Sequence, residues 1–470
     1  MGQYSMRVFF GLVSLGKEAI FDISIEGTRV SSLLRGWSSH DDQVFAESLV
    51  YLLNGTATIC FHSVGLGDPA IISFELLQVE DTAYNGGQSR DNGVVQRTVT
   101  RLNYGARKGK FDEDYNGDIW GGNRFWSPKK AGARIITVNA IKNASASPNF
   151  YPEELYQSAL VSRDEELDLS YTMEAEPGKN YSVWLHFAEI DDSITLEGER
   201  VFDVLVNGNT VFEDEDIIKL TGESYTALVL NSTVSVTGKS LVIVLHPKLG
   251  SHALISAIEI FEVIKMESRT SRDEVIVLQL LKKALRVPSR TGWNGDPCVP
   301  QQHPWNGVHC QLDGNGKQTR WFIDALLKGL LTSNISTLKH LHNINLSHNN
   351  IHGGITASLG YIKSLEVLDL SYNSFNGSVP GSLRELTSLR ILKLEGNPLL
   401  ENVAAPVRES KHHTSSHRQA TIISVTVSLS FLVIAALVCA AIWWRRQQDI
   451  TRAQHKAAGR APYAKFELPL

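Results

Sequence analysis

The acidic stretch at residues 112–123 is the first place where residue types and spacing could hold a metal ion. Asp112, Asp114 and Asn116 alternate with other residues and Gly117 follows, as at the start of a calcium-binding loop. Such a loop needs a bidentate glutamate at its twelfth position, where this chain has Asn123. The spacing therefore predicts a polar turn, and we expect no bound metal.

Three histidines and one pair of acids are the other residues that could do chemistry. His412, His413 and His417 could share a metal, but their serine-rich surroundings are typical of a solvated stalk. Asp191 and Asp192 could suggest glycoside hydrolysis, but that reaction needs two acids at a defined separation across a cleft, and neighbours in sequence are better read as solvated loop acids. No phosphate-cradling or dinucleotide-binding glycine pattern follows a strand. We predict a binding protein, not an enzyme, with no cofactor.

Residues 421–444 form an uncharged apolar run, and this run indicates where the protein is located in the cell. As a helix it would be about 36 Å long, enough to cross a bilayer core of about 30 Å. Arg445 and Arg446 follow at once, so the basic tail faces the cytoplasm. A buried core helix is the alternative, but Trp443 and Trp444 close the run as residues at a membrane interface do. We predict one plasma-membrane span, with the N-terminal bulk outside and a tail too short for an intracellular enzyme.

Cysteine usage agrees with an exported chain. Of the four cysteines, Cys439 lies in the apolar run and should remain a thiol. Cys298 and Cys310 lie in the segment placed outside, where oxidising conditions favour a disulfide between them. Cys60 is then alone, either as a free buried thiol or as the survivor of a pair whose partner is missing from this sequence; we favour the second. The net charge of −5 gives no electrostatic reason to expect nucleic acid as a partner.

The N-terminal sequence and the N-glycosylation sequons also bear on whether the chain is exported. Residues 4–10 follow Met1 almost directly and have the pattern of a strand, without the basic and apolar regions of a signal peptide. Either the lone span acts as a signal-anchor, or the sequence is truncated at this end. Sequons for N-glycosylation precede the span at Asn54, Asn143, Asn180, Asn231, Asn334, Asn345 and Asn376.

A long internal repeat occupies the first half of the chain. Residues 4–10 match residues 181–187, residues 21–23 match residues 202–204, and Glu75-Leu76 matches Glu259-Ile260. Both copies alternate apolar and polar positions between glycine-containing turns, as strands of a β-sandwich do. Residues 102–179 precede the second copy, whereas only three residues precede the first. We predict a mainly β fold with tandem sandwiches, the first of which lacks its N-terminal half.

Motifs within this repeat resemble those of a known domain. Residues 102–105, 111–120, 149–152 and 184–189 resemble the malectin-like domains of plant receptor kinases, and the resemblance covers residues 1 to about 264. It implies a β-sandwich related to carbohydrate-binding modules. Aromatic faces stack on sugars and carboxylates accept hydrogen bonds from hydroxyls, so the candidate ligand contacts are Tyr104, Asp118, Trp120, Trp126, Tyr151 and Tyr156. Aromatic residues of a sandwich are more often core, and the ligand could equally be a peptide or another protein.

A short repeat with a spacing of 24 residues follows residue 333. Leu341, Ile344, Leu346 and Asn349 return as Leu365, Leu368, Leu370 and Asn373, and then as Leu389, Leu392, Leu394 and Asn397. This is the leucine-rich repeat pattern, in which leucines point inward and the asparagine bonds free backbone groups at each bend. One turn upstream, Phe322, Gly329, Leu331 and Ile335 keep the register, but Ala325 replaces the asparagine.

A cap is expected at the entrance of these repeats. Residues 271–274 form a capping box before the apolar run 275–285, and Pro288 follows its end. The segments 293–298 and 305–310, each Trp-Asn-Gly followed by a cysteine, resemble the plant repeat-capping motif, whose cysteines are bridged.

Together these segments resemble the malectin-like, leucine-rich-repeat receptors of plants, and the short tail resembles their kinase-less receptor-like proteins. We expect half of a first malectin-like domain at 1–83, a second at 98–264, a cap at 270–318, repeats at 319–400, a stalk at 401–419, a span at 420–444 and a tail at 445–470. The resemblance implies a receptor that binds cell-wall carbohydrate or a peptide or protein, and signals through a partner kinase. The alternative is an adhesion protein that tethers the membrane to wall polysaccharide.

Overall fold

The computed structural model describes residues 2–401, except for 12–17, 38–42, 53–56, 67–69, 86–92, 105–123, 125, 130–132, 163–166, 249, 289–292, 313–317 and 325–327. Within these described ranges no helix is both long and apolar enough to cross a membrane. The predicted stalk, span and tail, residues 402–470, lie outside them.

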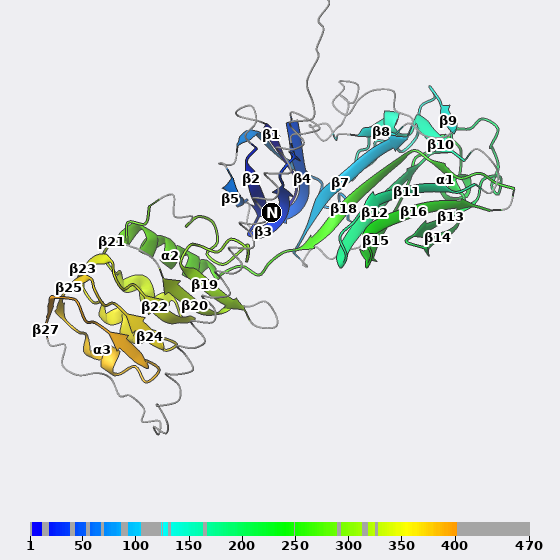
Figure 1. Cartoon of the computed structure of the whole chain (residues 1–470). Coiled ribbons are helices and arrows are strands. Elements are labelled where there is room, and N and C mark those ends of the chain that lie inside the picture. Colours follow the sequence, from blue (N-terminus) through cyan, green and yellow to red (C-terminus); the bar gives the residue numbers. More distant parts are fainter. Residues whose placement is uncertain are drawn as a thin grey trace, which may run out of the picture. The chain divides into compact units, whose positions relative to one another are not determined.

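One eight-stranded sheet runs through the first half of the chain (Figure 1). Its neighbours follow the order β15-β12-β18-β7-β4-β1-β6, with β8 parallel to β7 and all other pairs antiparallel. The strands are β1 (Gly2–Gly11), β4 (Gln43–Leu52), β6 (Ile71–Val79), β7 (Val94–Tyr104), β8 (Ser127–Lys129), β12 (Lys179–Phe187), β15 (Leu228–Val236) and β18 (Ala257–Lys265).

Smaller sheets complete two separate cores. The sheet β3-β2-β5 comprises β2 (Ile20–Ile25), β3 (Thr28–Leu33) and β5 (Ile59–Leu66), and it shares a core with β1 through Val8, Phe10 and Phe21. The sheet β11-β16-β13-β14 comprises β11 (Leu169–Glu174), β13 (Phe202–Val206), β14 (Asn209–Glu215) and β16 (Ser240–Pro247). Its residues Val204 and Ile243 pack in the second core. Short elements join this half, namely β9 (Ala133–Ile136), β10 (Ser158–Val161), β17 (Leu254–Ile255), η4 (Glu153–Leu155) and α1 (Ile217–Thr221).

The internal repeat in the sequence corresponds to a repeat in the strand order. β1 lies between β4 and β6, as β12 lies between β15 and β18. The strand β7 joins the two copies, because it pairs with β18 along one edge and with β4 along the other. β7 begins at Val94, before the predicted domain boundary at residue 98. The two sandwiches have separate cores but share one large sheet.

The cap begins with the helix α2 (Arg272–Ala284). The Ser271 side chain accepts a hydrogen bond from the Glu274 backbone amide, which is the expected capping interaction. A disulfide joins Cys298 to Cys310, so this prediction is confirmed. β19 (Val308–Leu312) then pairs antiparallel with β20 (Gln318–Asp324).

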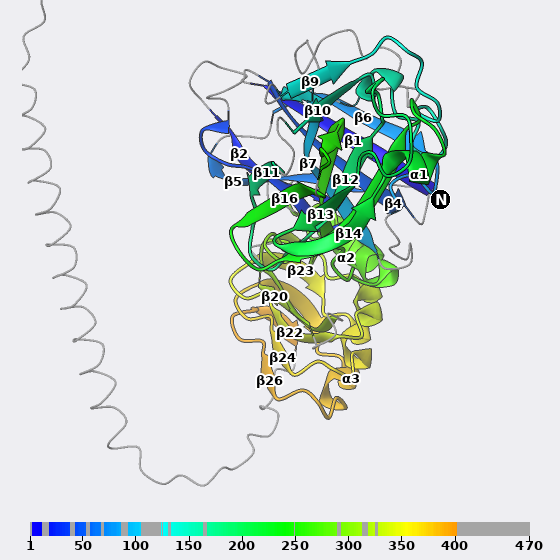
Figure 2. The same ribbon diagram turned by 90° about the vertical axis from the view of Figure 1, so that its right-hand side faces the viewer.

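The repeats form two parallel ladders that grow from the cap (Figure 2). One ladder contains β20, β22 (Leu341–Asn345), β24 (Val367–Asp369) and β26 (Ile391–Lys393); the other contains β21 (Lys328–Gly329), β23 (Asn350–Gly354), β25 (Ser374–Ser378) and β27 (Leu399–Glu401). Between them lie η6 (Ser333–Thr337), η7 (Ala357–Tyr361) and α3 (Gly381–Arg384). The Asn373 amide nitrogen donates to the carbonyls of Leu346 and Leu370, and its oxygen accepts from the Ile351 amide. The leucine-rich repeat prediction is confirmed.

Candidate ligand-binding site

The predicted aromatic contacts lie inside the second sandwich. Tyr104, Trp126, Tyr151 and Tyr156 are all buried, with exposed fractions between 0% and 4%. A ring with no exposed face cannot stack on a sugar, so these four residues are corrected from ligand contacts to core residues. The other two candidates, Asp118 and Trp120, lie outside the described residues.

Three of these rings meet around one buried histidine. The centroids of Trp126, Tyr151 and Tyr156 lie 5.7, 4.5 and 5.8 Å from that of His186 on β12, all in edge-to-face geometry. The Tyr156 hydroxyl lies 3.0 Å from His186 Nδ1. Burial lowers the pKa of His186, so the ring is held neutral. The sequence thus identified a real cluster but not its role, which is to fill the core.

An ion-pair network lies beside this cluster. Arg101 on β7 bridges Glu47 on β4 at 2.5 Å and Glu259 on β18 at 2.6 Å, and all three side chains are at most 1% exposed. Burial alone would raise the pKa of each acid, but the arginine charges and, for Glu259, the hydrogen bond from His186 lower both pKa values to about 2. Two ionised carboxylates that share an arginine hold β4, β7 and β18 together and are not arranged as an acid–base pair.

The sequons that the structure describes lie on strands, turns and repeats. Asn143, Asn180, Asn334 and Asn376 are exposed, and Asn231 and Asn345 are half-buried. Asn54 lies outside the described residues. Glycosylation at these sites stays a prediction.

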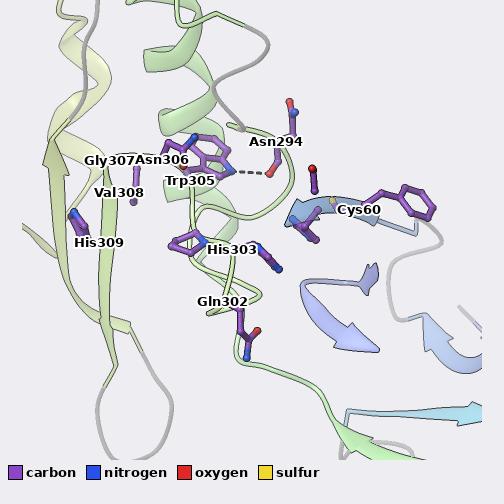
Figure 3. A pocket seen from close by; sticks show the side chains of 13 residues that line it. Cys60, Asn294, Gln302, His303, Trp305, Asn306, Gly307, Val308 and His309 are labelled. Carbon is purple, nitrogen blue, oxygen red and sulfur yellow. Dashed lines mark hydrogen bonds between the residues drawn. The ribbon is translucent and has the colours of Figure 1, made fainter. Parts of the chain in front are cut away.

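A cavity of about 520 Å³ lies between β5 and the loop of the cap (Figure 3). β5 contributes Cys60 and His62, and the cap contributes mainly amide and aromatic groups, including Asn294, Gln302 and Trp305. Polar groups that converge in a concave site are typical of ligand pockets. The cavity is therefore the candidate ligand-binding site.

Two stacked imidazoles cross this cavity. The rings of His62 and His303 are 4.6 Å apart and only 6° from parallel. His303 Nε2 lies 2.7 Å from the Asp22 carboxylate, and His62 Nε2 lies 2.8 Å from the Ser24 hydroxyl. Burial and the neighbouring His303 lower the pKa of His62 to about 4, so this ring is neutral near pH 6. The pair presents fixed hydrogen-bonding groups.

The cap wall of the cavity is held by two tryptophans. Trp293 and Trp305 stack with centroids 5.0 Å apart, and both are 1% exposed. Trp305 Nε1 donates to the Asn294 carbonyl and Trp293 Nε1 donates to the Asn306 carbonyl, each at 2.8 Å. Because each ring fixes the loop that carries the other, the polar lining residues are held in place.

The thiol of Cys60 lines the same cavity without a disulfide partner. Burial raises its pKa, and the hydrogen bond with Ser24 offsets this only in part. A nucleophilic cysteine needs the opposite shift, because the thiolate is the reactive form. The cavity is suited to hydrogen bonding with a ligand, not to attack on it.

Sequence reasoning missed most of this lining. Nothing local marks His62, His303 or Gln302, since their arrangement depends on contact between segments far apart in the chain. The one signal in the sequence was Cys60, which the expected Cys298–Cys310 disulfide leaves without a partner.

Comparison with known proteins identifies the families to which the two parts of this architecture are similar. The Malectin-like domain family matches residues 2–263, and the Leucine rich repeat family matches residues 339–399. Receptor-like protein 4 of Arabidopsis thaliana is 59% identical in an alignment that covers 99% of this chain and 79% of that protein. The chain belongs to the malectin-like, leucine-rich-repeat family of receptor-like proteins.

Other proteins are similar to this chain over shorter stretches. The nodulation receptor kinase of Pisum sativum is 31% identical over 258 residues, 52% of this chain but only 26% of that kinase. The crystal structure of the plant receptor-like kinase FER has a TM-score of 0.49 at 19% identity and covers 56% of this chain and 78% of the FER chain. At that similarity the FER structure does not bear on the ligand of this receptor-like protein.

Proposed function

We propose that this receptor-like protein is a single-pass plasma-membrane receptor whose ectodomain binds an extracellular ligand and which signals through a partner kinase. The cavity between β5 and the cap is the observation that carries the binding role, because it brings together imidazoles and amides that can hydrogen-bond to sugar hydroxyls or to a peptide backbone. The family supports the receptor role, since the relative that matches nearly the whole chain is a receptor-like protein.

Membrane attachment is part of the proposal. The apolar run at 421–444 with its following arginines supports a single span, and the disulfide of the cap supports an oxidising, extracellular location for the N-terminal bulk. The relative that matches 99% of this chain is named a receptor-like protein and not a kinase, which supports signalling through a separate kinase.

The binding role is tested by filling the cavity. Gln302 lines it and is exposed, whereas its neighbour Gln301 is also exposed but does not line it. The full chain in a mild detergent is titrated against an array of cell-wall oligosaccharides and extracellular peptides. We expect Gln302→Trp to weaken any bound ligand at least about tenfold and Gln301→Trp to leave its affinity unchanged. Equal binding by both variants would remove the cavity from the proposal.

Signalling and adhesion are separated by a second measurement. A receptor should co-purify with a kinase from membranes in a ligand-dependent manner, whereas an adhesion protein should retain insoluble wall polysaccharide without one. Wall binding without any associated kinase activity would favour the adhesion alternative.

A further inference from the structure

The second sandwich carries two exposed leucine side chains at one end (Figure 1). Leu196, in the loop 188–201 between β12 and β13, is 65% exposed, and Leu220, in α1, is 51% exposed. This end lies away from the first sandwich. β4 pairs with residues 95–97 at the start of β7, whereas the end of β12 is aligned through β18 with Asn103 at the end of β7.

The two leucines lie on neighbouring segments that run in opposite directions. The Gly198 amide donates to the Asp216 carboxylate at 2.5 Å, and the Ser224 hydroxyl donates to the Ile194 carbonyl at 3.4 Å. Each leucine is halfway between the two contact points of its own segment. The two residues therefore form one apolar patch, which we call the leucine pair. Exposed aliphatic side chains that gather in this way mark an interaction surface.

The loop that carries Leu196 is held in one conformation. The Glu199 carboxylate accepts hydrogen bonds from the amides of Thr195 and Leu196 at 2.7 and 2.9 Å. Further back in the loop, the Asp191 carboxylate binds the buried Arg200 at 3.2 Å. A side chain on a backbone fixed in this way loses less conformational entropy on binding, so Leu196 is suited to anchor a partner.

The first copy of the internal repeat lacks this loop. Its equivalent connection, residues 11–20, is shorter and contains one acid, Glu18. The two copies share their strand order, so the fold itself does not require the longer loop of the second copy. The acids that the longer loop contains are Glu189, Asp191, Asp192, Glu197 and Glu199.

Several of these acids surround the leucine pair. Asp192, Glu197 and Glu199 are exposed, and Lys219 is one exposed cation in α1. The amides that bind Glu199 lower its pKa, so this carboxylate keeps its charge. The surface thus combines aliphatic contact area with a negative potential. Potentials across an interface are complementary, which favours a partner with basic groups beside an apolar side chain.

Other occupants fit this surface less well. A second copy related by two-fold symmetry brings the acids of one patch against the acids of the other. An acidic wall polysaccharide carries the same sign of charge as the patch. A neutral polysaccharide stacks best on aromatic rings, which neither leucine supplies. A segment of a partner protein is the occupant that suits both the aliphatic and the charged part of the surface.

We propose that the leucine pair docks a segment of a partner protein that carries lysine or arginine beside an apolar side chain. The aliphatic contact supplies affinity, and the surrounding acids select the partner and speed its association. This inference rests on the proposed receptor function and assigns one class of partner to a surface distinct from the cavity.

The probes are two panels of fluorescent peptides of equal length, titrated into the full chain in a mild detergent. Every peptide has leucines at its centre, which are flanked by lysines in one panel and by glutamates in the other. We expect the best lysine-flanked peptides to bind at least about tenfold more tightly than their glutamate-flanked counterparts. Added salt should reduce this difference, because it screens exposed charges.

Two matched pairs of variants locate the binding. Leu196→Ser/Leu220→Ser should weaken the lysine-flanked peptides at least about tenfold, whereas Leu167→Ser, at a leucine of the same sandwich that is 49% exposed, should not. Glu197→Lys should weaken them about threefold or more, and Glu174→Lys, the same charge change at another exposed position, should not. These variants should fold, because each replaced side chain is exposed.

Four outcomes overturn the proposal. One is that no peptide of either panel binds below about 1 mM. Another is equal affinity for both panels, which indicates unspecific adhesion to an apolar surface. The third is equal weakening by the control variants, which places the binding elsewhere. The fourth is a dimer that Leu196→Ser/Leu220→Ser dissolves, which assigns the surface to a second copy. In each case ligand binding that responds to Gln302→Trp would still support the proposed function.

Discussion

Removing the Arg101 side chain should destabilise the large sheet more than removing the partly exposed Arg97 side chain on the same strand. Arg101 is 1% exposed and lies within 2.6 Å of two carboxylates that are both fully buried. Arg101→Met keeps much of the volume but leaves Glu259 without a cationic partner at that distance. Breaking a buried pair in this way costs about 3–5 kcal/mol.

The neighbouring Arg97 provides the control. Its side chain is 29% exposed, and its buried partner Glu262, 2% exposed, keeps Lys179 as a second cation, so Arg97→Met should cost only about 1 kcal/mol. Hydrogen exchange of β7 and β18 amides at pH 7 reports this sheet separately from the repeats. If Arg101→Met costs less than about 1 kcal/mol, or if both variants cost the same, the reasoning that burial decides the value of these ion pairs is refuted.

Three further predictions concern the network, the repeats and the cap. The folded-state pKa values of Glu47 and Glu259 are about 2, below their ordinary value of 4.5. The stability that these carboxylates give to the folded sheet should therefore be complete above about pH 5 and be lost as the pH falls toward 2. Acid titration followed by hydrogen exchange at the β7 amides measures this loss. Asn373→Ala leaves the Ile351 amide without its acceptor, whereas the Leu346 and Leu370 carbonyls each keep a bond from Asn349 or Asn397; the change should cost about 1–3 kcal/mol, measured by urea unfolding of the repeats. Cys298→Ser opens a short loop and should cost about 3 kcal/mol, and a Cys310→Ser variant should cost the same, because either change removes the same bond.

Two results would count against the latter predictions. An Asn373→Ala variant as stable as the parent would show that water replaces the lost bonds. If the two cysteine variants lose different amounts of stability, the surroundings of each serine, and not only the lost disulfide, determine the stability of the cap.

The sequence by itself determined the features that repeat locally. The 24-residue spacing of leucine and asparagine predicts the turns of the repeats, because each turn depends only on its neighbours. The capping box at Ser271 was also predictable from local sequence. The Cys298–Cys310 disulfide was predictable because the two cysteines are only 12 residues apart. Alternating strands predicted the sandwiches, and self-comparison related β1 to β12.

Only the tertiary structure decided which side chains are accessible. Tyr151 and Tyr156 have the residue type of a sugar platform, but the strands around His186 bury them. His62 and His303 stack although they are far apart in the chain, and no local pattern encodes that contact. Periodicity fixes the face on which a residue lies, whereas burial depends on which distant segment covers that face. Phe74 and Leu76 on β6 illustrate the same point, because they are exposed although the sequence of β6 matches that of the buried strand β18.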